Sequence, residues 1–195
     1  MPLDVLGLTD DASVRPAVPA DANAVAAIMA RSYRSDYADA LPASMLAELT
    51  PEVLVPGWSG AIGSPPSAGH RVLVACSGAT VVGYAAVGPS PDEDAGAQDG
   101  ELLALEVDPM NRRAGHASRL LAAAADLLRE QDMVALRTWL LDDDQARRAF
   151  LTSAGLVDDG ARRRYADADL ALVQVRFSAL LAADDTPEPV AGEPE

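Results

Sequence analysis

The sequence contains no lysine, and it has few cysteines, histidines and aromatic residues. A P-loop needs a lysine after its glycine-rich turn, so the absence of lysine excludes that phosphate-binding motif. Cys76 is the only cysteine, which excludes a disulfide within the chain and indicates a small buried residue in a strand-like run. Because His70 and His116 are the only histidines, we expect no metal site built from histidine and cysteine.

Long apolar runs are also missing. No segment approaches the length of a membrane helix, and the first residues, MPLDVLGLTDD, lack the charged and apolar regions of a signal peptide. The 195 residues are 49% hydrophobic, which is enough for one sizeable core. We therefore expect a cytoplasmic protein with an N-terminal extension (residues 1–12), one domain (13–180) and a disordered acidic tail (181–195).

Positive charge is scarce as well. The chain has 30 acidic residues against 15 basic ones, all of them arginine, which gives a formal net charge of −15. Such a surface repels nucleic acids and anionic membranes, so we expect neither as a partner. It favours a cationic substrate, although solubility explains the same excess equally well. The sequence does not decide whether the protein forms a homodimer.

Apolar periodicity and turn residues predict an alternation of strands and helices. The expected strands share runs of apolar and β-branched residues; they cover 13–18, 71–76, 80–87, 102–107, 134–141, 156–164 and 168–177. The expected helices cover 19–33, a region 43–62 broken by Pro51 and Pro56, 115–130 and 144–154. This order predicts an α/β (α+β) fold with a mixed sheet of about seven strands and about four helices.

The segment from Glu101 to Leu121, ELLALEVDPMNRRAGHASRLL, is the most informative part of the chain. An apolar strand ends at Asp108-Pro109, and a short loop leads into a helix. A helix N-terminus presents unpaired N–H groups and a partial positive charge, and small residues let a phosphate approach the backbone. The segment therefore predicts a phosphate cradle. Its residues would be Arg112, Arg113, Ala114, Gly115, His116 and Ala117.

The pattern Arg112-x-x-Gly115-x-Ala117 resembles the acyl-CoA signature of the GNAT superfamily of N-acetyltransferases. That signature reads Arg or Gln, two residues, Gly, one residue, then Gly or Ala. The preceding Val107-Asp108-Pro109 and the later Leu120-Leu121 also fall where the family has similar residues. The resemblance covers about residues 13–180 and implies a GNAT fold with a central splayed sheet and acetyl-CoA as the cosubstrate.

A second stretch, DQARRAFLTSAGL from Asp144 to Leu156, is similar to another family landmark. There the family has Asn, then Ala, then a Tyr four residues before Gly-Phe. Asp144 takes the place of the Asn and is carried over as a cofactor-binding residue. Leu151 takes the place of the Tyr, which often acts as general acid. No donor is then evident for the leaving thiolate, although Tyr84 or Tyr165 could supply one; packing is the favoured role for each.

The resemblance also implies how the cofactor lies. The strands on either side of the phosphate-binding helix splay apart, and the pantetheine arm pairs with exposed backbone as a strand would. Leu105 and Val107 would offer those backbone groups. A backbone N–H near Leu103 or Leu105 would meet the charge that develops on the carbonyl oxygen. Arg112 and Arg113 would supply local positive charge for the phosphates.

An amine that attacks a thioester must lose a proton, because a free alkyl amine has a pKa of about 10. Glu101 is the candidate base, since a Glu at this strand position serves that role in several GNAT enzymes. Strand alternation predicts Glu101 on the same face as Leu103, Leu105 and Val107, and roughly 20 Å from Val107. Glu106 is then expected on the opposite face, in solvent.

The expected function is transfer of an acetyl or acyl group from acetyl-CoA to a primary amine, by direct attack in a ternary complex. The acceptor would be a small molecule or a peptide N-terminus, and the sequence does not identify it. Trp58 is expected to line the acceptor pocket and Trp139 to lie in the core. The alternative is a catalytically weak acyl-CoA-binding sensor, which Asp144 and Leu151 suggest.

Overall fold

The computed structural model describes residues 12–167 and 170–181. The predicted N-terminal extension and acidic tail lie outside these residues, apart from one residue of each. The strands form one seven-stranded sheet in the order β1-β2-β3-β4-β5-β7-β6. The strands are β1 (Ala12–Pro16), β2 (Arg71–Ser77), β3 (Thr80–Pro89), β4 (Asp99–Val107), β5 (Ala135–Leu141), β6 (Val157–Asp167) and β7 (Leu170–Leu180).

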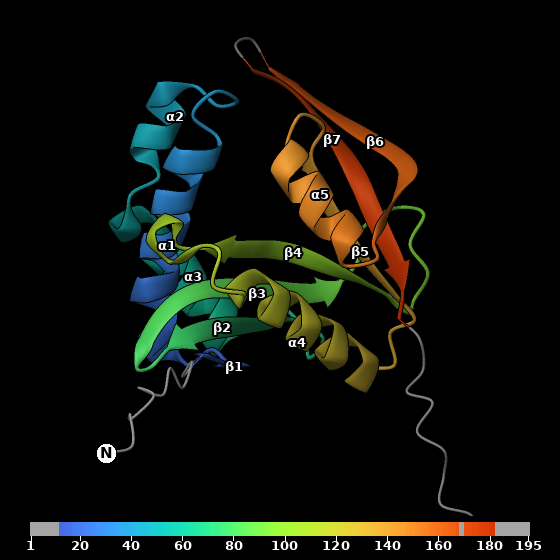
Figure 1. Cartoon of the computed structure of the whole chain (residues 1–195), viewed down its shortest axis with the longest axis horizontal. Helices are drawn as coiled ribbons and strands as arrows, with labels where there is room; N and C mark the ends of the chain where they lie inside the picture. The colour runs from blue at the N-terminus through green and yellow to red at the C-terminus, as the bar shows by residue number, and fades with distance from the viewer. Residues whose placement is uncertain (1–11, 168–169, 182–195) are drawn as a thin grey trace, which may run out of the picture.

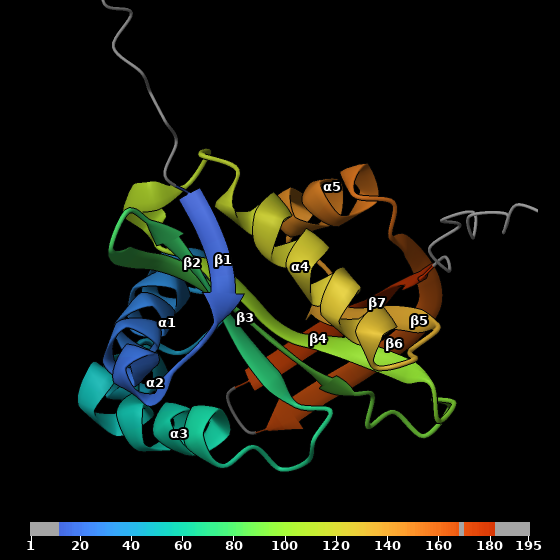
Figure 2. The same cartoon turned by 90° about the horizontal axis from the view of Figure 1, so that it is seen from below.

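Helices lie on both sides of the sheet. They are α1 (Ala22–Asp36), α2 (Ala43–Glu48), α3 (Pro51–Gly63), α4 (His116–Glu130) and α5 (Gln145–Ser153), with short 3-10 turns at Pro19–Asp21 and Pro109–Asn111. The first three helices gather beside β1 to β4 (Figure 1), and α4 and α5 lie on the opposite side, which faces the viewer in Figure 2. Among residues 12–167 and 170–181, none of the helices combines the length and apolar character that crossing a bilayer requires.

The predicted mixed sheet and the order of its elements are confirmed. One expectation about prolines is wrong in part. Pro51 occupies the first turn of α3, where a missing N–H costs nothing, but Pro56 lies inside this helix and does not end it. The last strand, Leu170–Leu180, ends three residues later than predicted.

Two apolar clusters, one on each face of the sheet, hold the helices in place. On one face, α4 contributes the buried Leu120 and Leu128 to a cluster that includes Leu102 of β4. On the other face, Ile28 of α1 packs with Tyr84 of β3 in a cluster that also contains Cys76 and Val25. The predicted role of Cys76 as a small buried residue is confirmed.

Strand β4 contains a bulge that changes which side chains share a face. Ala86 of β3 pairs with Ala104, but Val87 pairs with Leu102, so Leu103 is the extra residue. Since an extra residue shifts the alternation by one, Glu101 lies on the same face as Ala104 and Glu106.

The predicted face of Glu101 is therefore wrong. Leu102, Leu105 and Val107 contact the cluster beneath α4, whereas Glu101 belongs to the face toward α1. The sequence-based count assumed unbroken alternation, and a single bulged residue reverses it.

The pairing between β4 and β5 is short. These two parallel strands are in register only from Asp99 to Glu101 against Ala135 to Arg137, within the described residues. Beyond this point the strands diverge, so the edge of β4 from Leu102 to Val107 has no strand beside it on the β5 side. The splay predicted from the family resemblance is confirmed, and it leaves backbone groups of β4 available.

Two glycine substitutions test the packing between β3, β4 and α4. A Cβ at Gly83 would lie 2.9 Å from the backbone oxygen of Glu106 and 3.2 Å from a methyl group of Leu120. Gly83→Ala should therefore lower the free energy of unfolding by about 1–3 kcal/mol. Gly57→Ala is the matched control, because nothing lies within 4 Å of a Cβ there.

Gly57 lies inside α3, so its replacement by alanine should raise the free energy of unfolding by up to about 1 kcal/mol. Urea denaturation followed by circular dichroism measures both changes. Two variants of equal stability would show that the contact between β3 and β4 is less tight than this structure has it.

Candidate active site

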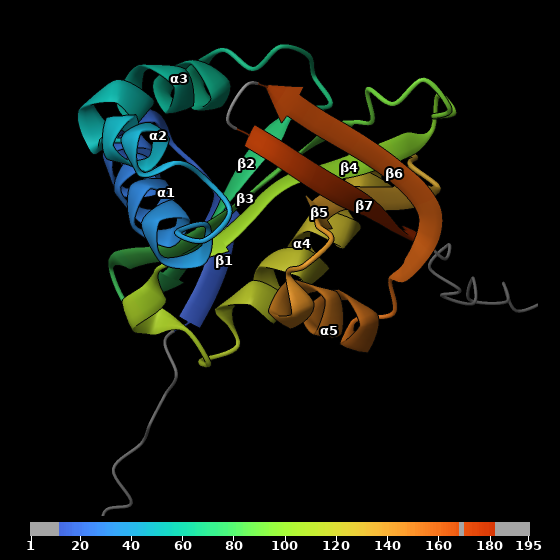
Figure 3. The same cartoon turned by 90° about the horizontal axis from the view of Figure 1, so that it is seen from above.

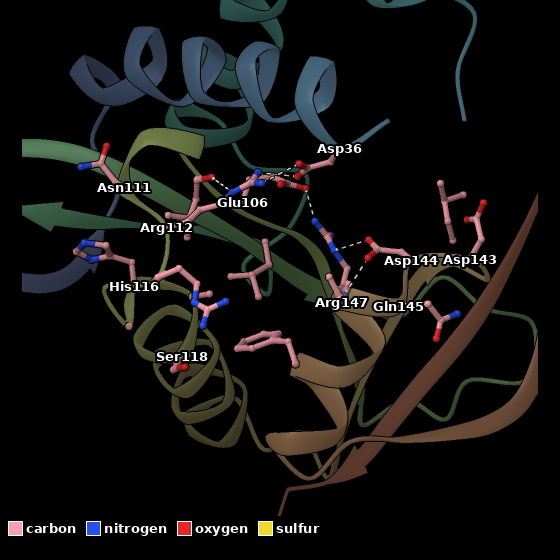
Figure 4. A pocket seen from close by; sticks show the side chains of 18 of the residues that line it. Asp36, Glu106, Asn111, Arg112, His116, Ser118, Asp143, Asp144, Gln145 and Arg147 are labelled. Carbon is pink, nitrogen blue, oxygen red and sulfur yellow. Dashed lines mark hydrogen bonds and ion pairs between the residues drawn. The ribbon is translucent and has the colours of Figure 1, made fainter. Parts of the chain in front are cut away.

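A cavity of about 810 Å³ opens where β4 and β5 diverge (Figure 4). Its wall includes the end of β4, the loop that follows, the first turn of α4, the end of β5, and one side of α5. The last residues of α1 and the residues after them, including Asp36 and Asp39, close one side. The structure thus brings together Leu105, Val107 and the predicted phosphate cradle, which the sequence placed together only through the family motif.

The N-terminus of α4 opens into this cavity without a side-chain cap. Its cap residue is Gly115, whose φ of 78° lies in the left-handed region that glycine adopts most easily. By contrast, the Asp144 side chain caps α5 by accepting a hydrogen bond of 2.9 Å from the Arg147 N–H. The first N–H groups of α4 therefore stay available to an anion, next to Ala117 and Ser118.

The two arginines of the loop have different surroundings. Arg112 forms a bidentate pair with Asp36 of α1, at 2.8 and 2.7 Å, and also donates to the backbone oxygen of Val107 at 3.3 Å. Its charge is compensated, so it fastens the loop to α1. Arg113 is exposed at the cavity, and its φ of 67° turns the chain toward the helix. Arg119 of α4 completes the loop by donating to the Ala114 oxygen at 2.8 Å.

His116 is buried at the start of α4, and its Nδ1 atom has no hydrogen-bond partner in the part of the chain that the structure describes. Figure 4 shows its ring directed away from Arg147 and Asp144, so the side chain packs at the edge of the cavity.

Glu106 is the main feature that the sequence reasoning missed. It is 4% exposed and pairs with Arg147 of α5 at 2.9 Å, so the pair spans the gap between β4 and α5 (Figure 4). Arg147 also lies 3.5 Å from Asp144. Burial raises the pKa of Glu106, and the charge of Arg147 opposes that rise. The expectation of a solvated Glu106 is wrong, because α1 covers its face of β4 and Arg147 reaches it from α5 through the gap beside the strand.

Three tyrosines surround this ion pair. Tyr33 and Tyr37 of α1 have ring centroids 4.7 Å apart, and Tyr84 is the cross-strand partner of Glu106. Burial, together with the negative charge of Glu106, holds the pKa of Tyr84 well above its usual value. Trp58 packs edge-on against Tyr84 at 4.8 Å and borders the core. Its predicted place in an acceptor pocket stays a prediction.

Glu101 lies at the other end of β4, on the face toward α1. It is 5% exposed, and the Ser90 hydroxyl donates a hydrogen bond of 3.2 Å to its carboxylate. Burial is the main cause that raises the pKa of Glu101, and the nearby Asp92 raises it further. A carboxylate with a raised pKa is a better proton acceptor near neutral pH than an exposed one.

Leu151 does not face the cavity. Its side chain is 1% exposed and belongs to the core cluster, whereas the preceding Phe150 lines the cavity. Trp139 was predicted to lie in the core, and this prediction is wrong. It is partly exposed on the face toward α1, and its Nε1 donates to the Asp92 carboxylate at 3.1 Å, so it is not a core residue.

The sequence profile of the Acetyltransferase (GNAT) family matches residues 26–156. The chain therefore belongs to the GNAT acetyltransferase family, whose members are generally acyltransferases. Among curated proteins, no sequence matches significantly.

Solved structures share the fold at low sequence identity. A ribosomal-protein-alanine N-acetyltransferase from Brucella melitensis is 24% identical, with a TM-score of 0.67 over 86% of this chain and 99% of that one. The yncA acetyltransferase from Salmonella typhimurium, solved with acetyl-CoA, is 16% identical, with a TM-score of 0.66 over 92% and 99%. The PaiA N-acetyltransferase from Thermoplasma acidophilum, solved with coenzyme A, is 14% identical, with a TM-score of 0.64 over 84% and 97%.

The Glu106–Arg147 pair can be tested through its pH dependence. Arg147→Met leaves a buried carboxylate without its partner, which should lower the free energy of unfolding by on the order of 3 kcal/mol at pH 8. Without Arg147 the pKa of Glu106 rises further, so the folded variant keeps the proton at low pH. The destabilisation should therefore shrink as the pH falls from 8 to 5.

The double variant Glu106→Gln/Arg147→Met provides the control, because it removes both charges. It should be more stable than Arg147→Met alone at pH 8, and the difference should be lost in acid. Urea denaturation at several pH values measures this. A constant loss at every pH would mean that Arg147 contributes by packing and not by its charge.

Proposed function

We propose that this protein transfers an acyl group, with acetyl as the expected group, from acyl-CoA to a primary amine. The observation that carries the proposal is the splay of β4 and β5, which opens a cavity directly beside the uncapped N-terminus of α4. A peptide edge for an extended arm and a set of N–H groups for a phosphate lie in one cavity, as an acyl-CoA requires.

The residues present fit this cosubstrate, which supplies the activated acyl thioester when bound. The N–H groups from Gly115 to Ser118 would hold the pyrophosphate, with Arg113 as the local cation. The edge of β4 at Leu105 and Val107 would orient the pantetheine arm. Two carboxylates of the cavity, Asp36 and Glu106, form ion pairs with arginines, so their negative charge repels a bound anion less.

Glu101 would accept the proton of the attacking amine, directly or through water. Its burial and raised pKa support this role, since a carboxylate with a raised pKa is a stronger base than an exposed one. The bulge at Leu103 disturbs the β3–β4 ladder close to Glu101. A backbone N–H near Leu103 or Leu105 would stabilise the charge that develops on the carbonyl oxygen.

The thiolate would leave without a general acid at position 151, because Leu151 lies in the core. A thiol with a pKa of about 8.5 leaves unprotonated at modest cost. The same observation favours the second candidate function, an acyl-CoA-binding sensor with little turnover. Release of free thiol from acetyl-CoA across a panel of amines separates the two. Turnover above background hydrolysis supports the enzyme, and tight binding without turnover supports the sensor.

Ser118→Glu tests the phosphate site. Ser118 is exposed in the first turn of α4, where an added carboxylate favours the helix but repels a phosphate. The dissociation constant for acetyl-CoA should rise by about tenfold or more, and less so at high salt. Ala122→Glu adds the same charge one turn further along the exposed side of α4 and should change the constant by less than about twofold. Isothermal titration calorimetry measures both; equal effects would place the phosphates elsewhere.

Glu101→Gln tests the base. Turnover at pH 7 should fall by about 100-fold, with unchanged affinity for acetyl-CoA, and the loss should shrink at high pH as free amine becomes available. Ser90→Ala removes the hydrogen bond that lowers the pKa of Glu101. The acid side of its pH profile should therefore move to higher pH. A Glu101→Gln loss that is uniform across pH would assign Glu101 a structural role instead.

A further inference from the structure

Beyond Glu101, a group of polar side chains shares the face of the sheet toward α1. Arg137 of β5 lies beside Glu101 of β4 in the strand register, and Trp139 follows two residues later on the same face. In the strand register, Trp139 lies opposite Arg176 of β7, and Arg163 of β6 lies opposite Gln174 of β7. Figure 3 looks onto this side, where β6 and β7 lie in front and α4 and α5 lie behind them.

Most charges on this face compensate one another. Arg176 pairs with Asp94 at 2.7 Å, with Asp159 at 2.8 Å and with Asp92 at 2.9 Å. Arg137 pairs with Asp99 and with Asp94. Asp92 also accepts the hydrogen bond of Trp139. The acidic loop between β3 and β4 is therefore engaged by arginines and does not form a free cation site.

Arg163 is the exception. Its Nε donates to the Gln174 side chain at 2.6 Å, and its guanidinium lies over the Trp139 ring, 4.3 Å from the centroid. The ring and the amide fix the plane of the guanidinium but leave its charge uncompensated. Within residues 12–167 and 170–181, no carboxylate pairs with it. In a chain of net charge −15, a held guanidinium without an acid is a ready partner for an external anion.

Arg163 also lies near the proposed base. The side chains of Glu101 on β4, Trp139 on β5 and Arg163 on β6 lie on the same face, and the Arg163 side chain reaches the Trp139 ring across β7. The positive charge of Arg163 acts to lower the pKa of Glu101, which agrees with this proximity. An acceptor whose amine reaches Glu101 would therefore place its neighbouring atoms toward the free edge of the Arg163 guanidinium.

We propose that the acceptor is an amine that also carries a carboxylate, such as a free amino acid, and that Arg163 binds this carboxylate in a bidentate pair. Trp139 and Gln174 are positioning residues, because they hold the guanidinium plane. This inference rests on the proposed acyl transfer and specifies its acceptor. The remaining acids and arginines of this face form ion pairs with one another, so we expect Arg163 to make the main charged contact with the acceptor.

The test compares alanine, methionine and phenylalanine with their primary amides as acceptors, at pH 7 with saturating acetyl-CoA. At least one free amino acid should be preferred over its amide by about tenfold or more in kcat/KM. The amine of an amide is less protonated at this pH and so more reactive. A preference for the free acid would therefore reflect binding and not intrinsic reactivity.

Arg163→Gln should raise KM for the free amino acid by about tenfold or more, with little change in kcat and little change for the amide. Arg163→Lys should recover only part of the loss, because an ammonium cannot reproduce the bidentate fork. Arg164→Gln is the matched control: this neighbour is exposed and pairs with Val173, on the opposite face of β6. It should leave both acceptors unaffected.

The outcomes separate the two proposals. A failure to bind acetyl-CoA, measured by calorimetry, would overturn the proposed function itself. If acetyl-CoA binds, three results would overturn the assignment of Arg163 as the carboxylate site. They are equal use of acids and amides, an equal effect of Arg163→Gln on both, and no turnover of any member of the panel. Unchanged acetyl-CoA affinity in Arg163→Gln shows that the variant is folded.

Discussion

The short parallel pairing between β4 and β5 is the constraint on which the rest of the structure depends. Parallel neighbours need a crossover connection, and α4 supplies it by packing against β1 to β4 on one face. Because the strands separate after three paired residues, the crossover helix begins beside an open edge of β4. The cavity, the exposed strand edge and the helix N-terminus are thus results of one topological choice.

Around that opening, acidic side chains form ion pairs with two of the arginines. Asp36 compensates Arg112, and Glu106 compensates Arg147, so two arginines at the cavity serve the protein's own structure. An anion at this site would consequently depend on Arg113 and on backbone N–H groups, whose partial charge does not vary with pH. A protein this acidic can then bind an anion without a strongly basic surface.

Much of the architecture could be predicted from the sequence. Strand and helix periodicity predicted the order of the elements. The segment from Arg112 to Ala117 predicted the cradle through its small residues at a helix start and through its resemblance to the family signature. The rest depends on contacts between distant segments. Asp36 is 76 residues before Arg112, and Glu106 is 41 residues before Arg147, and no local pattern couples such pairs. The bulge at Leu103 likewise arises from the register with β3, which the β4 sequence does not encode by itself.

The bulge decides which face of β4 carries Glu101. Glu101 and Glu106 are five positions apart, and unbroken alternation would place them on opposite faces; with Leu103 as an extra residue they share one face. Deletion of Leu103 would leave the two glutamates four positions apart, so simple alternation would keep both on the face toward α1. If Leu103 instead joined the ladder with β3 and no residue were lost, Glu101 would turn toward the apolar cluster beneath α4. The strand should therefore tolerate the loss of this residue better than the loss of its bulge.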